Sequence, residues 1–139
     1  MSKLYYQAVA MAVAVLVTAI AIFPHTYKDV DLLSEVMYWE NWYTDKDHLA
    51  AYYTGAVVMN RVHSKNYPDT VEGVLYQKGQ YTTTKYFFTE TIPAECRQMA
   101  IDILAHGTPD VPKNVIFQAT FRQGSGKWKI INGEWFCYE

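Results

Sequence analysis

The sequence contains no concentration of positive charge. Its 12 Lys and Arg residues are outnumbered by 14 Asp and Glu residues, giving a formal net charge of -2 at pH 7, and no basic run is present that could follow a phosphate backbone. Nucleic acid is therefore not expected as a partner. The low hydrophobicity and high charge of disordered proteins are absent, because 50% of the residues are hydrophobic. A chain of 139 residues does not require a second core, so we expect one folded domain.

Cysteine is scarce. Cys96 and Cys137 are too few for a disulfide scaffold, and they lack the C-x-x-C spacing of a zinc ribbon or a thioredoxin-like site. Two alternatives stay open for them. They form one disulfide if the domain matures in an oxidising compartment, or they are two separate buried thiols.

The common motifs of metal and nucleotide chemistry are also missing. The four histidines are His25, His48, His63 and His106. They follow no ligand spacing such as H-E-x-x-H, so we interpret them as surface or structural residues. Residues 124–127 (GSGK) lack the upstream glycine of a phosphate-binding loop and the spacing of a nucleophile elbow, and they are expected to form a turn. Neither a metal nor a cofactor is predicted.

An apolar segment opens the chain. Residues 8–23 contain no charged or amide side chain, and Lys3 is the only side-chain cation before them. This pattern predicts export, either by a cleaved signal peptide or by an uncleaved hydrophobic helix that anchors the chain in the membrane. We accordingly divide the chain into residues 1–24 as signal peptide or membrane anchor, 25–28 as a linker, and 29–139 as the folded domain.

Apolar residues at helical spacing predict three main helices in the folded domain. Asp29 is the expected N-cap of the first helix. The second is expected from Thr44, which forms a capping-box-like pair with Asp47, to about His63. The third opens at Pro93, a residue suited to the start of a helix.

The last third of the sequence changes to the two-residue period of strands. Residues 115–121, 128–131 and 134–138 are expected to form three strands. Asn132-Gly133 predicts a tight hairpin between the last two, because a type I′ turn needs positive φ at both central residues. The fold class is therefore α+β, with helices first and a small antiparallel sheet last.

One carboxylate lies on the apolar stripe of the first helix. Glu40 is seven residues after Leu33, which places both on one face. Burial, the neighbouring Trp39 and the C-terminal end of the helix should all raise the pKa of Glu40. A protonated carboxyl group of this kind can protonate a glycosidic oxygen. The alternatives are a structural Glu40 paired with Arg61 or Lys85, and a Glu40 that emerges to solvent at the helix end.

Three stretches of the sequence resemble a known family. They are residues 32–40 (LLSEVMYWE), 55–62 (GAVVMNRV) and 67–77 (YPDTVEGVLYQ), continued by Gln80-Tyr81-Thr82. Together they resemble the cell wall hydrolase family of the spore cortex-lytic enzymes (SleB/CwlJ type). The match runs over about residues 32–138, and its most specific part is Asn-Arg-Val followed at fixed spacing by Pro-x-Thr and Tyr-Gln.

The resemblance implies a compact, lysozyme-like catalytic domain at residues 29–139. Such a domain cleaves the glycan strands of peptidoglycan outside the cytoplasmic membrane, as a glycosidase or a lytic transglycosylase, and a bacterial or a phage origin fits equally. Glu40 stands where the family has its essential glutamate and would be the general acid/base. One acid suffices for transglycosylation, since the sugar's own 6-hydroxyl can attack, whereas hydrolysis needs a second carboxylate. Glu72 and Glu90 are candidates for that second acid, although we interpret both as solvated.

Residues 78–91 are rich in Gly, Gln, Thr and Tyr without a helical period, which predicts an ordered loop lining the site. Gln80, Tyr81 and Thr82 lie in this loop and are expected to bind the sugar, which favours planar amides and aromatic rings.

Asn60 and Arg61 are interpreted as architectural residues that tie loops together. The sequence departs from the family where Trp39 and Trp42 crowd the glutamate, positions usually held by small residues. An alternative function is a non-catalytic, membrane-anchored adaptor that binds peptidoglycan. It is disfavoured because such a module would gain stability from an apolar residue in place of a buried Glu40.

Overall fold

The computed structural model describes residues 25–139 of the chain. The predicted signal peptide or anchor, residues 1–24, lies outside these described residues. The elements are α2 (Tyr27–Asn41), α3 (Leu49–His63), α4 (Val71–Leu75), the 3₁₀ helix η1 (Thr82–Tyr86), α5 (Ala94–His106), β1 (Val115–Ala119), β2 (Gly126–Ile131) and β3 (Glu134–Tyr138). The α+β class is as predicted. Within the described range no helix has the length and apolar character needed to cross a membrane.

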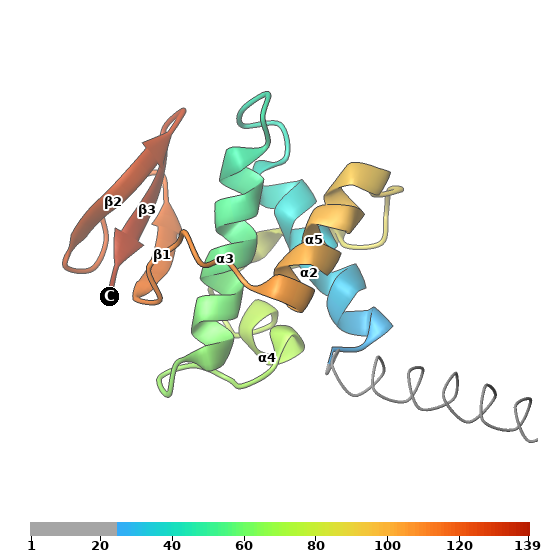
Figure 1. Cartoon of the computed structure of the whole chain (residues 1–139), viewed down its shortest axis with the longest axis horizontal. Coiled ribbons are helices and arrows are strands. Elements are labelled where there is room, and N and C mark those ends of the chain that lie inside the picture. Colours follow the sequence, from blue (N-terminus) through green and yellow to red (C-terminus); the bar gives the residue numbers. More distant parts are fainter. Residues whose placement is uncertain (1–24) are drawn as a thin grey trace, which may run out of the picture.

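Helix α3 separates the two parts of the fold. The other helices lie on one side of it and the three-stranded sheet lies on the opposite side (Figure 1). Eleven of its 15 residues are buried, as expected for a helix that is covered on all faces. The core is accordingly split into a helical cluster and a second cluster between α3 and the sheet.

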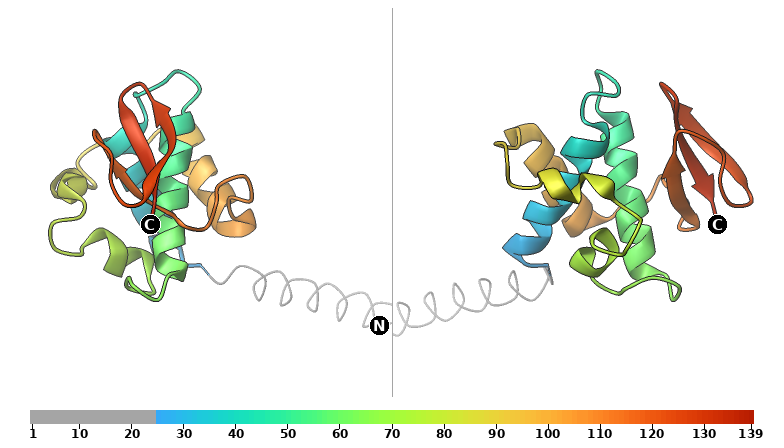
Figure 2. Two further views of the ribbon diagram at one scale, coloured as in Figure 1. Left: turned by 90° about the vertical axis from the view of Figure 1, so that its left-hand side faces the viewer. Right: turned by 180° about the vertical axis from the view of Figure 1, so that it is seen from behind.

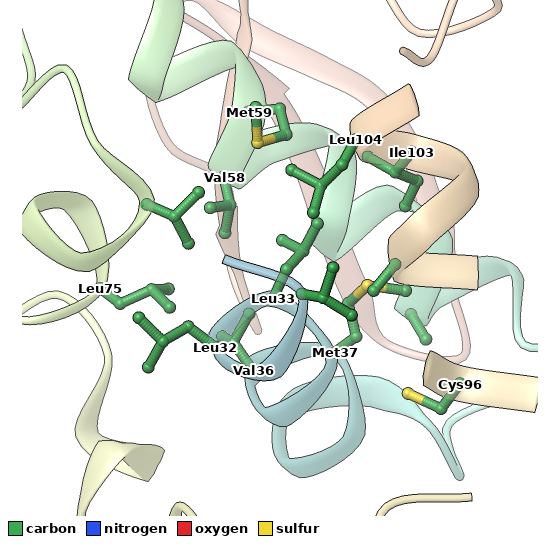
Figure 3. Packing of buried hydrophobic residues seen from close by; sticks show 14 of the residues in the cluster. Leu32, Leu33, Val36, Met37, Val58, Met59, Leu75, Cys96, Ile103 and Leu104 are labelled. Carbon is green, nitrogen blue, oxygen red and sulfur yellow. The ribbon is translucent and has the colours of Figure 1, made fainter. Parts of the chain in front are cut away.

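The helical cluster buries the stripe predicted for the first helix. Leu33, Val36 and Met37 of α2 are completely inaccessible, and Figure 3 shows them among side chains from α3 and α5. The helices approach closely at Gly55 of α3, where an added Cβ would lie 2.6 Å from Cδ1 of Ile103. A larger residue there would require the side chains of Ile103 and Met37 to shift.

Helix α2 begins three residues earlier than predicted. Its N-cap is Thr26, and Asp29 occupies position N3 of a capping box. The Thr26 side chain accepts from the backbone N–H of Asp29 at 3.3 Å, while the Asp29 carboxylate accepts from the backbone N–H of Thr26 at 2.8 Å. Tyr27 and Lys28, which we had placed in the linker, therefore belong to the helix.

Helix α3 is capped differently from the prediction. It begins at Leu49, and the expected pair at Thr44 and Asp47 does not form its N-terminus. Instead the Asp45 carboxylate accepts from the backbone N–H groups of Leu49 and Ala50, both at 2.9 Å. The loop turns back before the helix starts, which lets a residue outside the usual cap position reach the free N–H groups.

The sheet is antiparallel in the order β1-β3-β2. The predicted hairpin turn is confirmed, with φ of 45° at Asn132 and 91° at Gly133. Strand β1 ends at Ala119 rather than at residue 121, and β2 begins at Gly126 rather than at 128. Both strands adjust their register to β3 through bulges, so their ends do not follow the alternation of the sequence.

A pair of side chains joins the end of α3 to β1. Asn60 Nδ2 donates to the carbonyls of Pro112 and Val115, both at 2.9 Å. Arg61 Nε donates to the carbonyl of Ile116 at 2.7 Å. The architectural role predicted for Asn60 and Arg61 is thus confirmed.

The two cysteines are separate buried thiols in this structure. Cys96 on α5 lies in the helical cluster with its Sγ 3.5 Å from the carbonyl of Ser34, whereas Cys137 is on β3. The disulfide alternative is therefore not adopted. Burial raises the pKa of the Cys96 thiol to about 12, which keeps it protonated and unreactive at neutral pH.

The Asn60 contacts should contribute measurably to stability. Asn60→Ala removes a buried donor from two carbonyls, and we expect the free energy of unfolding to fall by about 1–3 kcal/mol. The measurement is urea unfolding followed by circular dichroism. Asn66→Ala is the matched control, because the Asn66 amide also donates a hydrogen bond, to the Glu139 carboxylate, but does so at the exposed surface. It should cost less than about 0.5 kcal/mol, and equal losses in both variants would contradict the role of Asn60.

Candidate active site

Glu40 lies in the last turn of α2 and is half-buried. Burial raises the pKa of its carboxyl group, and a hydrogen bond from the Thr83 hydroxyl partly lowers it. Thr83 Oγ1 donates to Glu40 Oε1 at 2.5 Å. The expected direction of the pKa shift is confirmed, and the side chain keeps access to solvent.

The cations proposed as structural partners of Glu40 are engaged elsewhere. Arg61 Nη1 donates to Oε1 of Gln80 at 3.0 Å, and the Lys85 ammonium lies 4.9 Å from the ring centroid of Tyr86. Among residues 25–139 the ion pairs are His25–Asp29, Lys28–Glu72 and Arg97–Asp31. Glu40 is therefore not held as one half of a structural ion pair within the described part of the chain.

The three predicted sugar-binding residues have different environments. Gln80 and Thr82 are exposed, and Gln80 is tied to Arg61. Tyr81 is only 6% exposed and packs in the helical cluster, so its ring offers no open face to a ligand. Burial raises the pKa of Tyr81 to about 12, with a smaller contribution from the charge of Glu40, so Tyr81 lies close to the acid.

Residues 78–91 include a 3₁₀ helix that the sequence did not predict. η1 begins at Thr82 and carries Thr83, the residue that contacts Glu40. We had taken its neighbours as ligand-binding residues and missed Thr83 itself. Three consecutive threonines offer no periodic signal to single out the one that faces α2.

Two further carboxyl groups near Glu40 also have raised pKa values. Glu35 is 3% exposed, and burial raises its pKa although Phe88 N–H and the Trp39 indole both donate to it. Because the Glu35 carboxyl group is buried and accepts a hydrogen bond from Trp39, we interpret Glu35 as a structural residue. Glu134, the first residue of β3, is half-buried. Burial raises the pKa of Glu134, the Asn41 amide lowers it, and the charge of Glu40 raises it further.

The acids that we had considered as a second carboxylate are not part of this group. Glu72 is exposed and pairs with Lys28 at 2.7 Å. Glu90 is exposed and accepts from the Tyr38 hydroxyl at 3.0 Å. The sequence analysis missed Glu134 because no local pattern relates the start of the last strand to the end of the first described helix.

Aromatic side chains gather on α2, on η1 and in the loop that follows α2. We define the aromatic cluster as Tyr38, Trp39, Tyr43 and Tyr86. Ring centroids are separated by 5.2 Å in both the Tyr38–Trp39 and Trp39–Tyr86 pairs and by 5.7 Å in the Tyr38–Tyr43 pair. Tyr43 is 77% exposed and Tyr86 is 44% exposed. The cluster thus presents ring surface to solvent on the elements that carry Glu40 and Thr83.

A pocket of about 960 Å³ lies elsewhere, between the ends of α3 and α5 and the start of β1. Its lining includes His63, His106 and Asn114 and none of the predicted site residues. Groups of three or more His, Cys, Asp or Glu side chains able to hold a metal ion are not found among residues 25–139.

The chain was compared with known proteins. The domain fold is similar to that of the crystal structure of the catalytic domain of the Bacillus cereus SleB protein, with a TM-score of 0.62, 21% identity, and coverage of 81% of this chain and 91% of that one. It is likewise similar to the catalytic domain of the germination-specific lytic transglycosylase SleB from Bacillus anthracis, with a TM-score of 0.61, 21% identity, and coverage of 82% and 97%. No match is found among curated proteins.

The sequence itself matches a family model. The model described as Cell Wall Hydrolase aligns with residues 38–133, which is more than half of the chain and includes Glu40. The resemblance noted from the motifs and the likeness of fold agree with this match. The chain belongs to the cell wall hydrolase family, of the SleB/CwlJ type.

Proposed function

We propose that the protein cleaves the glycan strands of peptidoglycan, with Glu40 as the general acid/base. The observation that carries the proposal is a half-buried carboxyl group with a raised pKa, next to exposed aromatic rings, in a member of the cell wall hydrolase family. The substrate lies outside the cytoplasmic membrane, so the protein would act there.

The geometry of Glu40 suits proton transfer. Because the Thr83 hydroxyl donates to Oε1, the acidic proton resides on Oε2, which is free to deliver it to a glycosidic oxygen. The sugar then leaves with that proton as the bond to its anomeric carbon breaks. The Thr83 hydrogen bond strengthens as the carboxylate becomes charged, and it therefore stabilises the product of the transfer.

Two outcomes of cleavage can follow protonation by Glu40, of which only hydrolysis needs a second carboxylate. Attack by the sugar's own 6-hydroxyl gives an anhydro-sugar, as in a lytic transglycosylase, whereas attack by water gives a reducing end. Mass spectrometry of the fragments released from purified peptidoglycan distinguishes them. Gln80 and Thr82 remain proposed sugar contacts because Thr82 is exposed at the start of η1 and Gln80 is exposed just before it, whereas the buried Tyr81 is proposed to support the loop.

The first prediction concerns catalysis. Glu40→Gln keeps the shape of the side chain and its bond from Thr83 but cannot donate a proton, so release of soluble fragments should fall by at least about 10²-fold. Glu72→Gln is the control, since Glu72 is an exposed acid paired with Lys28, and it should retain full activity. If Glu40→Gln binds and cuts peptidoglycan normally, Glu40 is not the acid. If the parent protein binds without cutting, it is an adaptor.

The substitution Glu40→Gln should also change the stability of the protein in a pH-dependent way. The raised pKa means that folding favours the protonated form of Glu40, so the parent protein loses stability as the pH rises from the unfolded pKa of about 4.3 through the folded one. Glu40→Gln removes this loss. Its melting temperature relative to the parent should therefore rise between pH 4 and pH 8, and a constant difference across this range would contradict the raised pKa.

The aromatic cluster should bind the sugar chain. Tyr86→Ala removes an exposed ring that packs against Trp39, and an aromatic contact is worth about 0.5–1.5 kcal/mol. We expect KM for soluble glycan fragments to rise by about 2- to 10-fold with kcat unchanged. Phe121→Ala, which removes a ring that is 60% exposed beyond β1, should leave KM unaltered. Equal effects of the two substitutions would argue against a binding surface at Tyr86.

A further inference from the structure

Arg61 is a buried cation that forms no ion pair within the described part of the chain. It lies in the last turn of α3 and is only 4% exposed. Its hydrogen-bond partners are neutral: Nε donates to the carbonyl of Ile116 at 2.7 Å, and Nη1 donates to Oε1 of Gln80 at 3.0 Å. Because the donors of a guanidinium group lie in one rigid plane, these bonds fix the direction of the segments that Arg61 contacts.

Two aromatic rings complete the surroundings of the guanidinium group. Its Cζ atom lies 5.1 Å from the ring centroid of Tyr67 and 5.3 Å from that of Tyr81, which is within the range of a cation–π contact. Gln80 and Tyr81 are consecutive residues, so Arg61 holds both side chains. Tyr81 is also buried in the helical cluster. The chain immediately before η1 is therefore fixed to the end of α3.

The segment held by Arg61 leads directly into η1 and to the acid. The carbonyl of Tyr81 accepts from the hydroxyl of Thr84 at 3.0 Å and from its backbone N–H at 3.4 Å, at the start of η1. Thr83, the preceding residue, donates to Glu40 Oε1. In the right-hand view of Figure 2, the segment before η1 runs past α3, and η1 lies over the end of α2. A continuous set of contacts thus joins Arg61 through Tyr81 to Glu40.

We propose that Arg61 is a positioning residue for the acid, because it holds the segment before η1 where the Thr83 hydroxyl meets the carboxyl group of Glu40. This inference rests on the proposed function. The bond from Thr83 determines which oxygen of Glu40 carries the proton. A displaced η1 would leave the carboxyl group free to rotate, so fewer molecules would hold the proton in the productive orientation. Lysine cannot replace Arg61, since an ammonium group lacks the planar fork and the stacking surface.

The pH dependence of activity reports on this contact. A hydrogen bond to the carboxylate favours its ionised form, so the Thr83 bond lowers the pKa of Glu40 and its loss raises that pKa. Since Glu40 acts in its protonated form, loss of the bond should move the basic limb of the kcat/KM profile to higher pH. The other titratable groups that interact electrostatically with Glu40 are Tyr81 and Glu134. Both remain in place when Arg61 is replaced.

The test compares Arg61→Lys with Thr83→Val. Each should lower kcat by about 10- to 100-fold and move the basic limb to higher pH, and the double variant should show no greater shift than Thr83→Val alone. Arg97→Lys is the matched control, because Arg97 pairs with Asp31 where both side chains are accessible to solvent, and it should behave as the parent. Independently of activity, ¹³C NMR should show a higher pKa for the Glu40 carboxyl group in Arg61→Lys and in Thr83→Val.

A second variant tests the inference where Arg61→Lys does not fold. Gln80→Ala removes the bond to Arg61 from an exposed residue, and the Glu40 pKa should rise in this variant too. If Glu40→Gln is inactive while the folded variants at positions 61 and 80 keep the parent's Glu40 titration, the inference fails and the proposed function stands. If Glu40→Gln remains active, both proposals fail. Shifts that add in the double variant would also overturn the inference, because Arg61 would then act on Glu40 independently of Thr83.

Discussion

The burial of α3 on all sides is the constraint on which the rest of the fold depends. An apolar helix of this kind must be covered by separate layers, here α2, α4 and α5 on one side and the sheet on the other. The polar contacts of Asn60 and Arg61 then fix where β1 can lie along the helix. Because both layers are held to one helix, the end of α2 and the start of β3 come together although the sequence separates them widely.

The crowding of Glu40 by aromatic residues has a structural explanation. Trp39 does not compete with Glu40, because its indole N–H is bound to the enclosed carboxylate of Glu35 at 3.0 Å. Trp42 is stacked on His48 with ring centroids 3.6 Å apart and holds the loop before α3. Trp39 and Trp42 therefore do not cover the carboxyl group of Glu40. Although these two residues depart from the family pattern, the Glu40 side chain stays accessible to solvent.

The sequence predicted those features that local patterns encode. The stripe through Leu33 placed Glu40 at the border of the core, and Asn132-Gly133 specified the hairpin. The start of α2 was displaced because Thr26 and Asp29 form a capping box, and that of α3 because Asp45 reaches free N–H groups from outside the expected cap. Thr83 and Glu134 could not be found, since their contacts depend on how the layers pack. Tyr81 was misjudged because an aromatic residue within a polar segment can equally be an anchor directed into the core.

The strand order determines when the sheet can form as the chain is synthesised. β3 is the last strand in sequence but the middle strand in space, so β1 and β2 have no common partner until it is present. During synthesis from the N-terminus, the helical layer can assemble before the sheet is complete. The side of α3 that carries Tyr53 and Val57 stays exposed during that interval. The sheet, and any site shared between the two layers, can therefore form only after β3 has been synthesised.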